Sequence, residues 1–156
     1  MNADQADACM MFSKLIPTDK YNKYPLVQER MMAVMNENHP LALKSSMMVE
    51  ELNSQELVLI AKRDEPFFNE FISEEFEKKK ITAKIRAYGV WISAIKAVVK
   101  QSNCISLLPS QVAQSIQGDG VVCRKVEGLP DFYFSLITKC DGTKKNVLDF
   151  IRYVKI

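Results

Sequence analysis

The side chains that could carry out chemistry are few and widely spaced along this chain. His39 is the only histidine, so no histidine-based metal cluster can form around a second one. Glu74 and Glu75 are adjacent acids on the polar side of a predicted helix, where nothing marks them as an acid and base pair. The five glycines form neither a G-x-G-x-x-G pattern nor a Walker loop. We therefore predict no enzymatic activity, no metal and no cofactor.

The cysteines predict buried thiols rather than a redox or metal site. They include no Cys-x-x-Cys pair, and three of the four lie in apolar stretches typical of strands. They are Cys9, Cys104, Cys123 and Cys140. In such surroundings a reduced cysteine behaves as a small hydrophobic residue.

Two cations and two aromatic residues are the better candidates for ligand binding. Lys62 and Arg63 follow a predicted strand and precede a predicted helix, whose free N–H groups would also favour an anion. The alternative is that both cations are simply solvated, or that Asp64 pairs with one of them. Tyr88 and Trp91 follow a second predicted strand, where they would either stack on a ligand or pack partly buried.

Length and composition are those of one ordinary domain or two small lobes. Among the 156 residues, 21 basic and 19 acidic side chains nearly cancel, which does not support DNA binding by this chain alone. No apolar run approaches the roughly 20 residues that a membrane-spanning helix needs. Asp4 and Asp7 precede the first apolar patch, so the basic segment of a signal peptide is absent and a cytoplasmic location is predicted, away from membranes.

The first part of the chain predicts short elements joined by a loop. Asp7–Phe12 is an apolar run of strand length, and 26–35 is a longer apolar run interrupted by polar residues. Between them, 13–25 carries two prolines and several polar residues and is predicted as a loop. Residues 47–52 predict one helical turn, with Ser45 or Ser46 as its N-cap.

From Leu57 onward, strands and helices alternate, which predicts an α/β sheet. The predicted strands are 57–61, 81–87, 102–109, 121–125 and 132–139, with a turn at Tyr88-Gly89. The predicted helices are 64–79, 90–100, 110–116 and one that begins near 141–143, with Val147, Leu148, Ile151 and Val154 on one face.

Several of these segments, taken in order, resemble the effector-binding domain of LysR-type transcriptional regulators. Asn38-His39-Pro40-Leu41-Ala42 is similar to the His-Pro-Leu-Ala turn that ends a crossing strand in that family. Val49-Glu50-Glu51-Leu52 is similar to the short helix that follows. The stretch 90–116, VWISAIKAVVKQ, SNCISLLP and SQVAQSI, is similar to a helix, an apolar strand closed by Leu-Pro, and a second helix. The motifs occur in the family's order and at similar intervals.

One departure from the family concerns the turn before the apolar strand. The family usually has Gly-x-Gly there, whereas this chain has Gln101-Ser102-Asn103-Cys104. We therefore expect Ser102 or Asn103 to adopt the positive φ that glycine supplies at low cost, with Asn the better candidate.

The resemblance implies a two-lobed α/β domain of the periplasmic-binding-protein type II kind, with lobe II complete and lobe I partial. Residues 1–42 would form a strand, a loop and the crossover strand of lobe I. Residues 43–128 would form lobe II, and 129–156 the return strand and C-terminal helix of lobe I. The helix-turn-helix and the first part of lobe I would be lacking, so we expect either an excised piece or a truncated product that self-associates.

The resemblance also implies where a ligand would bind. In the family a small effector binds in the cleft between the lobes, and an anion is one candidate here. The matching positions in the loop after the first lobe II strand are Ala61, Lys62, Arg63, Asp64, Phe67 and Phe68. The matching positions after the second strand are Tyr88, Val90 and Trp91.

The implied function is that of a sensor that acts on DNA indirectly. Effector binding would be transmitted to DNA-binding domains outside this chain, and the chain would form a dimer or higher homo-oligomer. Phe67 or Phe71, on the helix ending at Lys79, would anchor the dimer contact unless both belong to the core. The alternative function is a free-standing small-molecule-binding module with no link to transcription.

Overall fold

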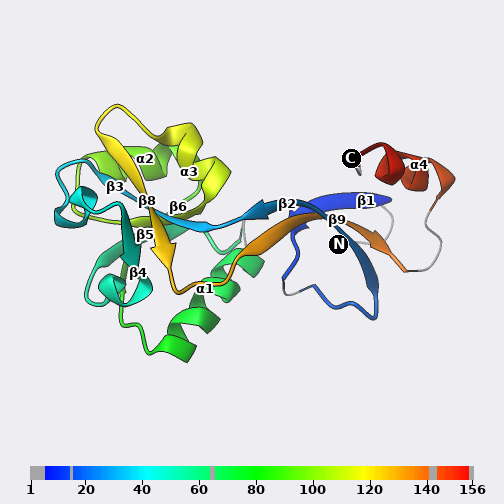
Figure 1. The fold of residues 1–156 in the computed structure, drawn as a ribbon, viewed down its shortest axis with the longest axis horizontal. Coiled ribbons are helices and arrows are strands. Elements are labelled where there is room, and N and C mark those ends of the chain that lie inside the picture. The colour runs from blue at the N-terminus through cyan, green and yellow to red at the C-terminus, as the bar shows by residue number, and fades with distance from the viewer. Residues whose placement is uncertain (1–5, 15, 64–65, 141–143, 155–156) are drawn as a thin grey trace. The chain divides into compact units, whose positions relative to one another are not determined.

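The chain divides into two compact units, which the computed structural model describes over residues 6–14, 16–63, 66–140 and 144–154. Unit 1 comprises Met1–Glu29 and Phe132–Ile156, and unit 2 comprises Arg30–Asp131 (Figure 1). Unit 2 is therefore continuous in sequence, whereas unit 1 is assembled from both ends of the chain. The lobe boundaries expected after residues 42 and 128 stay a prediction.

Unit 1 is a three-stranded antiparallel sheet with one helix packed on it. Its strands are β1 (Ala8–Phe12), β2 (Tyr21–Glu29) and β9 (Phe132–Lys139), and β9 lies in the middle. Helix α4 (Lys145–Val154) buries Val147 and Ile151 against Leu136 of β9. Leu148, predicted on the same helix face, is 40% exposed, and the predicted helix start at 141–143 lies outside the described residues.

The loop predicted for 13–25 is shorter than expected, because Tyr21–Pro25 belongs to β2. This segment pairs with the far end of the chain, Tyr21 opposite Lys139 and Pro25 opposite Ser135. β2 lies at the edge of the sheet, and its register shifts between Pro25 and Val27. An edge strand tolerates a proline, which cannot donate a hydrogen bond, so Pro25 did not mark a loop here.

Unit 2 contains a mixed sheet whose parts are joined by one bridge. Its strands are β3 (Met31–Asn36), β4 (Ser46–Met48), β5 (Glu56–Ile60), β6 (Lys84–Gly89), β7 (Ser106–Pro109) and β8 (Val121–Glu127). Four of them lie in the order β4-β8-β3-β7, and β5 pairs with β6 in parallel. Leu57 of β5 forms a parallel bridge with Ile105, just before β7, and this links the two parts.

The helices of unit 2 cover its sheet. They are α1 (Pro66–Lys79), α2 (Ile92–Lys100) and α3 (Ser110–Ile116), with two short 3-10 turns, η1 (Pro40–Leu43) and η2 (Val49–Leu52). Figure 1 shows α2 and α3 above the strands and α1 below them. Ile95 and Val99 of α2 pack with Ala113 of α3 against Val34 and Val58 of the sheet. The predicted α/β fold is confirmed.

The helical turn predicted over 47–52 starts two residues later than expected, because its first two residues belong to a strand. Met47 and Met48 pair in parallel with β8, and only Val49–Leu52 is helical. Neither predicted serine caps it: the Glu51 carboxylate accepts from the Met48 N–H at 2.9 Å instead.

The strand predicted over 81–87 is shifted toward the C-terminus. It runs from Lys84 to Gly89, so Tyr88-Gly89 ends the strand rather than forming a turn. Parallel pairing with β5 extends the strand to Gly89, and that pairing cannot be read from the local alternation. Ile85, expected on a covered face, is 42% exposed.

The turn between α2 and β7 does not use a positive φ. Among the described non-glycine residues, positive φ occurs at Ser54, Lys80 and Asp119. At this turn Ser102 acts through its side chain, because its hydroxyl donates to the Val98 carbonyl at 2.7 Å and accepts from the Cys104 N–H at 3.2 Å. A hydroxyl that satisfies the backbone thus replaces the left-handed residue that we predicted.

The apolar face of α1 belongs to the core. Phe68 and Ile72 are 3% exposed and Phe71 is wholly buried. Phe71 is therefore not available as an interface anchor, because the core encloses it. The side chain of Phe67 lies outside the described part of the chain.

Candidate functional site

The two predicted ligand-binding loops begin at one edge of the unit 2 sheet. In the parallel pair of β5 and β6, Ile60 lies opposite Gly89, so both strands end at the same level. The Ala61 N–H donates to the Gly89 carbonyl at 3.0 Å, which ties the start of one loop to the start of the other. Long-range pairing therefore brings together the starts of two loops that α1 and β6 separate in sequence.

The carboxyl end of β7 faces the same edge. The Val58 N–H donates to the Ile105 carbonyl at 3.0 Å, and the Leu57–Ile105 bridge is parallel, so β7 runs in the direction of β5. Ser110 follows β7 directly, and its hydroxyl accepts from the Arg30 N–H at 3.4 Å. Ser110 was not among the residues predicted at this edge, although a serine directly after an apolar strand is a recognisable sign of a helix start.

Most of the described loop side chains are accessible. Lys62 and Arg63 are exposed, and Trp91, Tyr88 and Val90 are 71%, 48% and 40% exposed. Trp91 is thus not the partly buried packing residue of the alternative interpretation. Cations and exposed apolar side chains on these two loops are the residue types that a ligand site combines, since apolar surface supplies area and a few polar groups supply orientation.

The remaining predicted site residues differ in their access. Ala61 is half-buried, and Phe68 lies in the core, where it supports the loop without reaching solvent. Asp64 and the side chain of Phe67 lie outside the described residues.

The charge of this edge is positive within its described part. Over 61–63 and 88–91 the charged side chains are Lys62 and Arg63. Glu56 and Arg86 form an ion pair, in which Arg86 Nη1 lies 3.0 Å from both carboxylate oxygens. Both residues lie within strands β5 and β6, ahead of these loops. Cations at the start of a loop are the side chains that would hold an anion.

Two contacts fix where these loops begin. The Asn69 side-chain amide of α1 donates to the Ile60 carbonyl at 3.1 Å. Gly89 packs so closely on α2 that a Cβ placed there would lie 2.6 Å from Ile95 Cγ1. Neither residue was predicted as part of the site, because the sequence pattern does not reveal a buried Asn or a close approach of backbone to helix.

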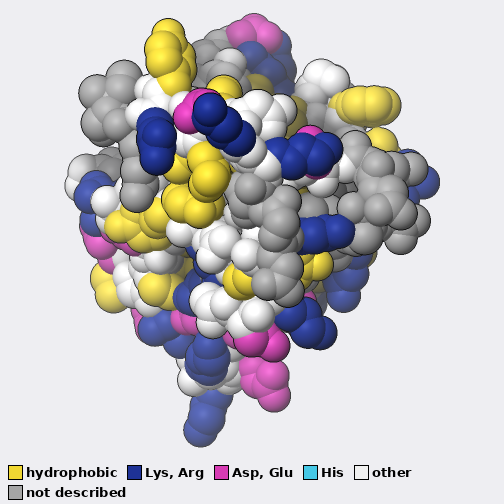
Figure 2. All heavy atoms as spheres, turned by 90° about the vertical axis from the view of Figure 1, so that its right-hand side faces the viewer, with side chains coloured by type: hydrophobic (Ala, Val, Ile, Leu, Met, Phe, Trp, Pro, Cys, Tyr) yellow, Lys and Arg dark blue, Asp and Glu magenta, His cyan; other side chains and the backbone are white. Residues whose placement is uncertain are grey.

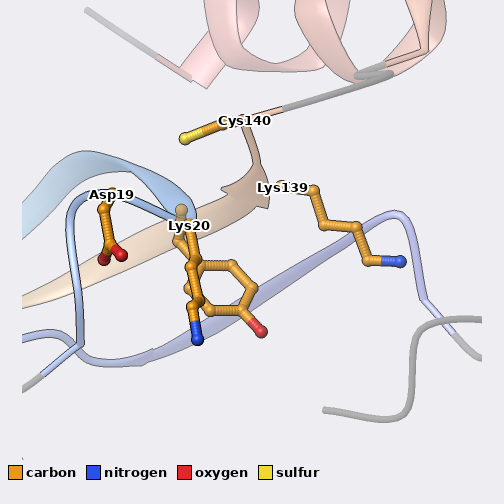
Figure 3. Close-up of a pocket in the computed structure, with 5 residues that line it drawn as sticks. Asp19, Lys20, Lys139 and Cys140 are labelled. Atoms are coloured by element: carbon orange, nitrogen blue, oxygen red, sulfur yellow. The ribbon is translucent and has the colours of Figure 1, made fainter.

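Unit 1 has a hollow of its own, lined by Asp19, Lys20, Tyr21, Lys139 and Cys140 (Figure 3). Its volume of about 260 Å³ is below the range usual for drug-sized ligands. Figure 3 shows the side chains of Asp19 and Lys139 pointing in different directions. These groups do not converge on one point, so they do not define a second site.

Hydrophobic side chains are also exposed on unit 1, but they are interspersed with charge. The largest are Met10, Tyr133, Leu148, Phe150 and Tyr153. In Figure 2, which faces the right-hand side of Figure 1, yellow hydrophobic groups alternate with blue lysine and arginine side chains. The described surface on this side is therefore mixed rather than one continuous apolar patch.

The cysteines follow the prediction in part. Cys104 and Cys123 are buried, Cys9 is half-buried and Cys140 is exposed, and all four are free thiols. Burial raises the pKa of the Cys9 and Cys123 thiols, which disfavours the reactive thiolate. Over the described residues, no three His, Cys, Asp or Glu side chains gather in a way that could hold a metal ion.

Comparison with known proteins shows which family this chain belongs to. The LysR substrate binding domain family matches residues 1–155. The chain belongs to this family, and the predicted resemblance is confirmed. It is an effector-binding domain of the LysR type, which is a regulatory domain rather than an enzyme. A search of curated proteins finds no match.

Solved structures share the fold at low sequence identity. The CcmR regulatory domain of Synechocystis PCC6803, in complex with 2-PG, is 16% identical with a TM-score of 0.79, over 96% of this chain and 72% of that chain. The QuiR effector-binding domain in complex with shikimate is 22% identical (TM-score 0.74, 96% and 72% covered). The BenM effector-binding domain with benzoate is 18% identical (TM-score 0.76, 95% and 68% covered).

These similarities confirm the two-lobed α/β fold class. Each of these three similar domains is in complex with a small molecule, which for BenM is its effector. Within the described part of the chain, no helix is both long and apolar enough to cross a membrane.

Proposed function

We propose that this chain senses a small organic anion at the edge formed by loops 61–63 and 88–91 and passes the signal to DNA-binding domains outside the chain. The observation that supports the proposal is the parallel register of β5 and β6, because the loop with Lys62 and Arg63 and the loop with Val90 and Trp91 start from paired strand ends. An anion with an apolar body would pair its charge with Lys62 or Arg63 and stack its body on Trp91.

The effectors of related domains support an anionic ligand. The complexes named above contain 2-PG, shikimate and benzoate. The latter two are carboxylates with a six-membered ring, which is the combination that cations beside an aromatic side chain favour. Signalling would follow by population shift: a ligand that binds one conformation more tightly raises the share of that conformation.

Binding of these three molecules to the purified chain tests the proposal. The single tryptophan, Trp91, reports on the site through its fluorescence. We expect at least one of the three to change Trp91 emission in a saturable way and to raise the melting temperature, because a ligand that binds only the folded state stabilises it.

Two lysine variants localise the binding. Lys62→Ala should weaken the binding of the responsive anion about ten- to a hundredfold, because a charge-assisted hydrogen bond contributes about 1.5–3 kcal/mol. Lys84→Ala is the matched control, since Lys84 is also exposed but starts β6 at its other end. Equal weakening in both variants would contradict the site, as would loss of folding in Lys62→Ala.

We also propose that the chain forms a dimer. Phe71 does not anchor it, and Ile85, which is exposed on edge strand β6, is the apolar candidate for the contact among the described residues of that strand outside the ligand loops. Light scattering should report a single mass of twice the chain. A monomer, or a polydisperse aggregate, would contradict this part of the proposal.

The alternative is a free-standing binding module with no link to transcription. The encoding gene distinguishes the two functions. A regulator continues upstream of Met1 into a helix-turn-helix, whereas a free-standing module does not.

A further inference from the structure

We infer that Asn69 is a positioning residue for the proposed effector site: through Ile60 it sets where the Lys62–Arg63 loop leaves the sheet, without touching the ligand. This inference rests on the proposed function, and it adds a residue that neither the sequence pattern nor the comparisons assign.

Asn69 is a polar residue in an apolar place. It lies on α1 between Phe68 and the pair Phe71 and Ile72, and it is 3% exposed. A buried amide is costly unless its hydrogen bonds are made. Its Nδ2 donates to the Ile60 carbonyl at 3.1 Å, nine residues back in the chain. Helix α1, which follows the Lys62–Arg63 loop, therefore holds the end of strand β5, which precedes that loop.

The next backbone group is held as well. Ile60 is the last residue of β5, and the Ala61 N–H donates to the Gly89 carbonyl at 3.0 Å. The Ile60 carbonyl and the Ala61 N–H belong to the same peptide unit, which is planar. α1 thus holds the carbonyl of this rigid peptide unit and β6 holds its N–H. Together they set the direction in which the chain enters Lys62.

The same peptide unit connects to the second loop. Gly89 accepts the Ala61 hydrogen bond and sits against Ile95 of α2, with no space for a side chain. Val90 and Trp91 follow immediately. A change in how Asn69 holds Ile60 therefore reaches the cations directly and the aromatic side chain through Gly89.

Hydrogen exchange of the free protein tests the positioning role before any ligand is added. In Asn69→Leu, the Ile60 carbonyl loses this donor, and we expect the Ala61 amide to exchange about tenfold faster or more. Trp91 emission should shift as well. Asn69→Ala removes the same donor with less bulk and serves if the leucine variant does not fold.

Asn53→Leu is the matched control. Asn53 Oδ1 accepts from the Thr82 N–H at 2.8 Å, so it is also an asparagine that holds backbone in this unit, but beside the opposite ends of β5 and β6. We expect this variant to leave Ala61 exchange and Trp91 emission unchanged. Unchanged Ala61 exchange in the Asn69 variants, or equal acceleration in the Asn53 variant, overturns the inference.

Titration with benzoate, shikimate and 2-PG then separates the inference from the proposed function. We expect the Asn69 variants to bind the responsive anion about tenfold more weakly, and Asn53→Leu to bind like wild type. If wild type binds none of the three, the proposed ligand class fails, while the exchange result still decides the role of Asn69. Wild-type affinity in the Asn69 variants would overturn the inference.

Discussion

A buried hydroxyl lies in β7 without a hydrogen-bond partner. Ser106 is wholly buried, and its Oγ is the one such side-chain atom within the described part of the chain. It lies opposite Val34 in the sheet, a member of the apolar cluster under α2 and α3. A polar group that leaves water without gaining a hydrogen bond costs free energy, so Ser106 weakens the fold.

Ser106→Ala should therefore leave the free energy of unfolding unchanged or raise it by up to about 1 kcal/mol. Urea denaturation measures the effect. Ser135→Ala is the control, because Ser135 is equally buried but its hydroxyl lies 2.7 Å from that of Ser13. That variant should lose about 1–2 kcal/mol, and an equal loss in Ser106→Ala would contradict the argument.

His39 couples the fold to pH. Its Nδ1 accepts from the Leu41 N–H at 3.1 Å and caps η1, which confirms it as a turn residue. Burial lowers the pKa of His39, opposed by a hydrogen bond to the Asn103 backbone. Protonation would also remove the Nδ1 acceptor, so the folded chain favours the neutral ring.

Stability should fall as the pH drops below about 6.5, the ordinary histidine pKa in an unfolded chain. The folded-state pKa is lower, so the unfolded chain takes up the proton first, and stability is lost until the folded-state pKa is passed. Urea denaturation between pH 7.5 and 5 measures the slope. His39→Asn should reduce it, and an unchanged slope in that variant would show that other groups produce it.

The close contact between β6 and α2 depends on Gly89, which has no side chain. Gly89 has no positive φ, so its backbone would accept any residue, and only the 2.6 Å approach of an added Cβ to Ile95 Cγ1 excludes one. The contact holds the end of β6, from which the second ligand loop begins.

Gly89→Ala should lower the free energy of unfolding by about 1–3 kcal/mol, as overpacking does. Gly118→Ala is the contrasting variant: Gly118 has φ +96° with no atom within 4 Å of an added Cβ, so it tests backbone strain alone. We expect Trp91 emission to change in Gly89→Ala and to stay unchanged in Gly118→Ala. Unaltered stability in Gly89→Ala would mean that α2 can move away at little cost.

The whole chain combines a continuous unit with a discontinuous one. Strand β9 lies between β1 and β2, so every strand pairing in the described unit 1 sheet includes it. Unit 2, by contrast, has its strands, helices and apolar cluster within Arg30–Asp131. The two units should therefore respond differently to the loss of the C-terminal segment.

Deleting Phe132–Ile156 should abolish hydrogen-exchange protection in β1 and β2 and leave protection in β3, β7 and β8. Unit 1 loses all its strand pairing, whereas the pairings of unit 2 are all internal. Mass spectrometry of exchanged peptides measures this. Retained protection in β1 and β2 would show that these strands pair in another way, for example with a second copy of the chain.

Local patterns were enough to predict the elements that depend on neighbouring residues. The strand 132–139 is a run of strand-forming residues bounded by Pro130, and it occurs as predicted. Local sequence also predicted α1 and its C-terminal end at Lys79. The signals were Pro66, the apolar spacing of Phe68, Phe71 and Ile72, and the lysines that follow. The family resemblance could also be recognised from sequence, because it rests on the order of such local motifs.

Pairing between distant residues decided the remainder. The first half of β2 is a strand because β9 pairs with it, and β6 extends to Gly89 because β5 pairs with it up to that residue. The same register joins the start of the Lys62–Arg63 loop to the strand end that leads to Trp91. A sequence pattern records which faces of an element are apolar, but the partners of its backbone groups come from segments far along the chain, and folding alone brings those together.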